Sequence, residues 1–107
     1  MNDAKCDNGS MTPEQWIKLF PPDMPIVILY CNPTFTDVDP WRYEDYLLAM
    51  HGDRMFEVTY DIDASKWVLL VTSDNWKTKE HEARANTCDG IMQKVREAGV
   101  LFWKGQQ

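Results

Sequence analysis

The alternation of apolar and polar side chains between residues 56 and 63 is the feature that most constrains the fold of this chain. The two alternating sets are Phe56, Val58, Tyr60 and Ile62, and Glu57, Thr59, Asp61 and Asp63. A period of two predicts a strand with one face in the core and the other in water. The turn-forming residues 63–66 follow, and the apolar run 67–72 then predicts the returning strand of a hairpin.

Two elements are predicted before this hairpin, a short helix and a buried strand. Thr12 and Gln15 form the pattern of a capping box around Pro13, and Pro21 ends the helix after two turns. The next apolar run, residues 26–31, lies between prolines and predicts a strand that is buried on both faces. Such a strand is expected in the centre of a sheet.

Three more elements complete the predicted order. Asp39, followed by a proline, predicts the start of a helix over residues 40–51. Residues from 76 or 78 to 98 predict a long helix that stops at Gly99, and residues 100–103 predict a last short strand. Without the N-terminal helix, this order is β-α-β-β-α-β. The sequence therefore predicts an α+β, ferredoxin-like fold with an antiparallel sheet and two packed helices.

This topology has consequences for the sheet. It places the strand 56–63 at an edge of the sheet and the strands 26–31 and 67–72 in its centre. Two helices cover only one face of such a sheet. The other face is expected to be covered by the N-terminal helix or by a second subunit, in a homodimer through the open sheet face.

A chain of 107 residues with 44% hydrophobic residues fits one domain. We expect a flexible N-terminus over residues 1–11, a single domain over 12–104 and a polar tail over 105–107. No apolar run approaches the length that a membrane helix needs, and no secretion signal is evident. The protein is accordingly expected to be cytoplasmic, without membrane contact and with reduced cysteines.

The formal net charge of −6 is concentrated in the middle of the sequence. Residues 37–74 contain nine acidic and three basic residues, whereas residues 75–107 contain six basic and four acidic ones. An acidic surface repels the phosphates of nucleic acid and attracts basic protein surfaces. Direct binding of nucleic acid is therefore disfavoured. A solvated acidic surface that only aids solubility is the plainer alternative.

The sequence offers no catalytic constellation, no metal site and no cofactor motif. Residues 61–66 begin like a calcium loop, but Lys66 stands where that loop needs glycine. Three cysteines without a CxxC pair do not predict a zinc site. RNA-recognition modules share the predicted topology, but their basic, glycine-bearing motif is missing.

The preferred hypothesis is a small, acidic, non-enzymatic protein-interaction domain that blocks a basic, nucleic-acid-binding surface of a partner protein. By analogy in size and charge alone, phage-encoded inhibitors such as anti-CRISPR proteins work in this way. The predicted partner-binding residues are six acids and two aromatic anchors: Glu57, Asp61, Asp63, Glu44, Asp45, Asp53, Trp67 and Trp76. At least one of the two tryptophans is expected to be exposed beside the acidic strand.

A second hypothesis comes from another class. Dimeric α+β barrel proteins pack two ferredoxin-like sheets face to face and enclose a small-molecule site. In this chain the pocket of such a protein or enzyme would be lined by Tyr30, Tyr60, Trp67 and Trp103. The sequence leaves the two hypotheses open.

Overall fold

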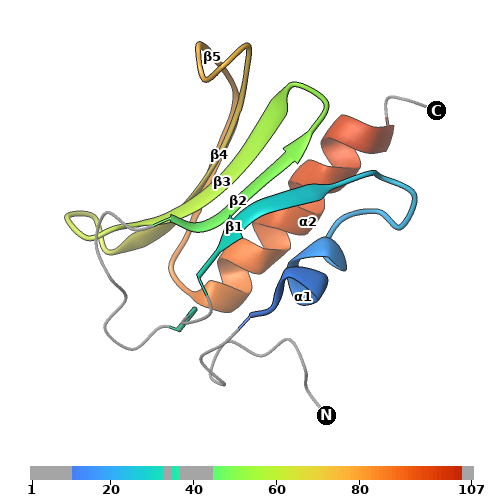
Figure 1. Cartoon of the computed structure of the whole chain (residues 1–107). Coiled ribbons are helices and arrows are strands. Elements are labelled where there is room, and N and C mark those ends of the chain that lie inside the picture. Colours follow the sequence, from blue (N-terminus) through green and yellow to red (C-terminus); the bar gives the residue numbers. More distant parts are fainter. Residues whose placement is uncertain (1–10, 33–34, 37–44, 105–107) are drawn as a thin grey trace.

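The computed structural model describes residues 11–32, 35–36 and 45–104, and in this part of the chain a five-stranded sheet packs against two helices (Figure 1). The strands are β1 (Val27–Cys31), β2 (Asp45–His51), β3 (Arg54–Asp61), β4 (Lys66–Ser73) and β5 (Thr78–Ala85). Helix α1 (Pro13–Ile17) precedes the sheet, and helix α2 (Cys88–Lys104) follows it. The strands lie in chain order, and every neighbouring pair is antiparallel.

The predicted central hairpin is confirmed. Strands β3 and β4 pair in the register that places Phe56 opposite Val71 and Val58 opposite Leu69. The turn between them is closed by the Asp61 carboxylate, whose Oδ1 accepts hydrogen bonds from the backbone N–H groups of residues 63 and 64. A short polar side chain that accepts from the backbone two residues later is a common way to stabilise such a turn.

The predicted start of the first helix is also confirmed. Thr12 Oγ1 accepts from the backbone N–H of Gln15, and the Gln15 side chain accepts in return from the backbone N–H of Thr12. These two bonds satisfy donors that a helix start otherwise leaves unpaired. The helix itself is only five residues long. Trp16 and Phe20, the latter just after it, are buried in the core.

The predicted ferredoxin-like fold is wrong, first because the sheet contains a strand where a helix is predicted. Residues 45–51 form β2; the rest of the predicted helix, with its Asp39 cap, lies outside the described residues. Leu, Ala and Met in this segment favour helix, but its pairing with β3 decides the structure. Gly52, the residue after the predicted helix 40–51, has a φ of 63° in the tight β2–β3 turn.

The second departure lies at the C-terminal end. Residues 78–85 form β5, and the helix begins at Cys88 and continues through the predicted last strand, 100–103. Thr87 marks the boundary, because its Oγ1 accepts from the backbone N–H of Gly90. Helix α2 therefore follows the sheet instead of connecting two parallel strands.

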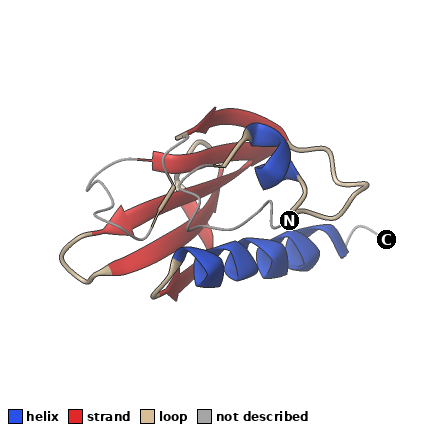
Figure 2. Ribbon diagram, turned by 90° about the horizontal axis from the view of Figure 1, so that it is seen from below, coloured by secondary structure: helices blue, strands red, loops and turns tan. Residues whose placement is uncertain are grey.

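Both helices cover the same face of the sheet (Figure 2). Phe56 of β3 shows this, since its ring lies 5.2 Å from the ring of Phe20, beside α1, and 6.0 Å from that of Phe102 on α2. Gly99 lets α2 approach the segment after α1, because a Cβ at this position would lie 2.9 Å from Pro21 Cδ. The core also includes Met11, which is buried although it was expected to belong to the flexible N-terminus.

Two further expectations are wrong, one about the positions of strands in the sheet and one about the cysteines. The strand β1 lies at an edge of the sheet, not in its centre, and β3, expected at an edge, is the central strand. Not all thiols are reduced, since Cys31 is free but Cys88 is disulfide-bonded.

Candidate functional site

The candidate site is the sheet face opposite the helices, here called the open face. No helix in the described part of the chain packs on it. Since side chains alternate between faces along a strand and paired residues share a face, the registers identify its members. From β2 to β5 they include Asp45, Leu48, Met50, Met55, Glu57, Thr59, Asp61, Val68, Leu70, Glu82 and Arg84.

A pair of carboxyl groups lies in the middle of this face. Glu57 has Leu48 and Leu70 as direct neighbours on the adjacent strands, and its side chain is hydrogen-bonded to that of Asp45. Desolvation between its neighbours, then this hydrogen bond, then the charge of Asp45 raise the pKa of Glu57 to about 8. The raised pKa favours the protonated form of Glu57, which is the form that can donate a hydrogen bond to the Asp45 side chain.

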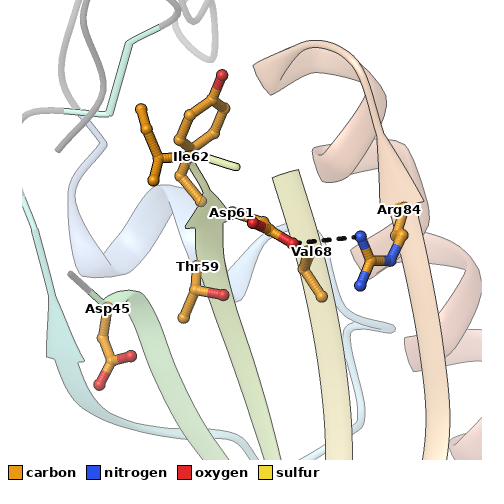
Figure 3. A pocket seen from close by; sticks show the side chains of 7 residues that line it. Asp45, Thr59, Asp61, Ile62, Val68 and Arg84 are labelled. Atoms are coloured by element: carbon orange, nitrogen blue, oxygen red, sulfur yellow. Dashed lines mark ion pairs between the residues drawn. The ribbon is translucent and has the colours of Figure 1, made fainter. Parts of the chain in front are cut away.

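An open hollow of about 500 Å³ lies next to this pair, toward the β3–β4 turn (Figure 3). Asp45, Thr59, Val68 and Arg84 form one row across the four strands β2 to β5 and contribute to its lining. Tyr60, Asp61 and Ile62 contribute the rest. The hollow thus combines apolar side chains with carboxylates at two of its sides.

Arg84 is the basic group of the hollow. Its guanidinium Nη1 lies 3.5 Å from Asp61 Oδ2 (Figure 3), and its Nε donates to Glu82 Oε2 at 3.1 Å. Glu82 also accepts from Lys79 at 3.0 Å. These two hydrogen bonds, first that with Lys79 and then that with Arg84, lower the pKa of Glu82 below its usual range. The β5 side of the open face is therefore a network of paired charges, whereas Asp45 has no basic partner among the described ion pairs.

The structure brings three of the predicted contact acids together, namely Asp45, Glu57 and Asp61. Asp63 is exposed in the adjoining turn. Asp53 lies in the β2–β3 turn at the opposite end of the sheet, and Glu44 lies outside the described residues.

The two predicted aromatic anchors have different environments. Trp67 is fully buried on the covered face, with its ring 4.9 Å from that of Tyr46, so it offers no surface to a partner. Trp76 is 47% exposed, as expected for one of the two, but it lies in the β4–β5 turn, at the end of the sheet away from Asp61 and Asp63.

The four residues of the alternative pocket are not brought together. Tyr60 and Trp67 contact each other on the covered face, whereas Tyr30 pairs with Leu48 on the open face. Trp103 lies on α2, with its ring 5.4 Å from that of His51. Because the dimeric α+β barrel hypothesis depended on a ferredoxin-like topology, the observed topology removes its basis.

Thr59, Ile62 and Val68 line the hollow but were not predicted as site residues, and Arg84 was predicted to lie on a helix. A signal for Arg84 was present. In residues 80–85, charged side chains alternate with histidine and alanine, which is the period of a strand.

Within the described ranges, no group of three or more metal-ligating side chains could hold a metal ion. No helix there is long and apolar enough to cross a membrane. Comparison of the chain with protein-family models, with curated proteins and with solved structures gave no match.

Proposed function

We propose that this protein is a non-enzymatic interaction domain that binds a basic surface of another protein through its open face. One observation carries the proposal: three carboxyl groups, those of Asp45, Glu57 and Asp61, lie among half-buried apolar side chains on a sheet face that no described helix covers. Apolar surface left uncovered on a small domain is typical of a docking site. Carboxylates within it select for a cationic partner.

The class of partner follows from charge. The protein has a net charge of −6, so long-range forces favour encounter with basic proteins and oppose encounter with nucleic acid. Basic protein surfaces commonly serve to bind nucleic acid. We therefore propose a nucleic-acid-binding protein as the partner and competition with its nucleic acid as the effect, as in phage-encoded inhibitors of the anti-CRISPR type.

The hollow suggests how such a partner would be bound. A lysine or arginine side chain of the partner would place its aliphatic part against Val68 and Ile62 and its charged end between Asp45 and Asp61. Asp61 already pairs with Arg84 at 3.5 Å, so Asp45 is the carboxylate with more capacity for a new cation. The apolar residues would supply contact area, and the acids would supply selectivity.

The test is affinity capture from a cell lysate with the tagged protein, followed by binding measurements on the purified partner. The informative variant is Asp45→Asn with Asp61→Asn. Asparagine removes the charge but keeps the side-chain oxygen that Asp61 uses in its turn. The matched control is Asp23→Asn with Glu97→Gln, which changes net charge equally at exposed sites away from the open face.

We expect the wild type to recover a basic, nucleic-acid-binding protein that elutes as salt rises. The open-face variant should bind that protein at least about tenfold more weakly, and the control should bind within about twofold of the wild type. An equal loss of affinity in both variants would mean that net charge alone explains the effect. Unchanged binding by the open-face variant would refute the proposal.

A further inference from the structure

The two edges of the sheet have opposite character. The edge strand β5 carries alternating charges, and its Lys79, Glu82 and Arg84 are joined by ion pairs. Charged side chains on an edge strand oppose pairing with another strand. The edge strand β1 has no charged residue, and neither has any position from 24 to 36. One edge is thus protected by charge, and the other is not.

The side chains of β1 are unusually exposed for apolar residues. Val27, Leu29 and Tyr30 are exposed by 55%, 49% and 45%. On one side the β1 backbone pairs with β2. Among the described residues, no backbone hydrogen bond joins residues 27–31 to any other segment. The outer side of β1 therefore presents backbone donors and acceptors beside apolar side chains, which is a template for a further strand.

We propose that β1 pairs with β1 of a second copy of this chain, antiparallel and about a twofold axis, so that two sheets join into one. The charge distribution limits where two copies can meet. Two copies that each carry −6 repel one another, but β1 has no charged residue, so pairing at this edge places no like charges opposite each other. A twofold contact is self-complementary, because each β1 satisfies the outer backbone groups of the other.

The geometry also bounds the strength of this contact. Strand β1 has five residues, and the register with β2 shifts between Ile28 and Tyr30. Such a bulge bends an edge strand and shortens the length over which it can pair. The contact is smaller than a standard interface of about 1,600 Å². The dimer is accordingly weak, and its population depends on protein concentration.

The test compares the two edges by sedimentation velocity over about a hundredfold range of protein concentration. Leu29→Lys adds one charge to the β1 edge, and Thr78→Lys adds the same charge to the β5 edge. Both positions are exposed, so neither variant should change the melting temperature by more than about 2 °C. We expect the wild type and Thr78→Lys to form dimers with rising concentration, and Leu29→Lys to require at least about tenfold more protein.

Hydrogen exchange identifies the contact independently. If β1 pairs with β1, amides within residues 27–31 become more protected as concentration rises, whereas packing of two open faces leaves these backbone groups unpaired. A wild type that stays monomeric over the whole range overturns the proposal. So does a dimer that survives Leu29→Lys, or one that forms without added protection in residues 27–31. None of these outcomes bears on binding of a basic partner by the open face.

Discussion

The covered face and the open face belong to the same strands, yet they have opposite properties. On β3, Phe56 and Val58 point toward the helices and are fully buried. Their neighbours Glu57 and Thr59 point the other way and remain half-buried. A step of one residue thus separates side chains that hold the fold together from side chains available to a partner. Substitutions can therefore be chosen in adjacent positions to separate stability from binding.

The largest expected effect comes from the covered face. Phe56→Ala removes a ring that contacts Phe20 and Phe102, and we expect it to lower the free energy of unfolding by about 3–5 kcal/mol. Thr59→Ala, on the open face of the same strand, should change it by no more than about 0.5 kcal/mol. Urea denaturation measures both. Similar losses in the two variants would mean that the faces do not differ as described.

A smaller effect is expected where the helical layer closes over the covered face. In Gly99→Ala, the new Cβ would lie 2.9 Å from Pro21 Cδ, so α2 and the segment after α1 must move apart. Overpacking costs about 1–3 kcal/mol, and the better helix propensity of alanine returns up to about 1 kcal/mol. We expect a net loss of about 1–2 kcal/mol in thermal or urea unfolding. Val100→Ala, at the next and exposed position, is the control, and a Gly99→Ala variant as stable as wild type would disprove the close contact.

The smallest effect on stability is a pH dependence that comes from the open face. The pKa of Glu57 is raised to about 8 in the folded protein, above its ordinary value of 4.5. Between these two values the folded state holds more protons than the unfolded state. The stability that protonated Glu57 contributes to the folded protein is therefore fully present below pH 4.5 and is lost as pH rises toward 8.

Glu57→Gln removes this dependence, because an amide does not titrate. Relative to the variant, the wild type should lose about 1 kcal/mol between pH 5 and pH 8.5, a figure reduced to allow for the solvent exposure of Glu57. Melting curves across this range measure the difference, with Glu97→Gln on the exposed side of α2 as control. Parallel curves for wild type and Glu57→Gln would show that the carboxyl group titrates normally.

The parts of the structure that were predictable from sequence depend on short-range patterns. The β3–β4 hairpin follows from the strict alternation after Phe56, and the start of α1 follows from the capping residues Thr12 and Gln15. Both signals lie within a few residues and have one physical interpretation. The predicted acids Asp45, Glu57 and Asp61 do meet on one face, although the predicted topology placed Asp45 on a helix.

The predictions that were wrong concern structure that depends on contacts between residues distant in the sequence. Leu47, Leu48, Ala49 and Met50 favour helix by propensity, and only their pairing with β3 makes them a strand. Gly99 looked like a helix stop because the approach of Pro21 cannot be read from sequence. The hydrogen bond between Glu57 and Asp45, and with it the raised pKa, likewise depends on the register of β2 against β3.

Carboxyl footprinting by mass spectrometry, on the protein alone and in complex with its captured partner, tests the role of the open face most directly. In the complex, Asp45, Glu57 and Asp61 should become protected from labelling, while Asp23 and Glu97 should be labelled as in the free protein. Protection confined to Asp23, Glu97 or other positions on the helical side would contradict the assignment of the open face as the binding surface.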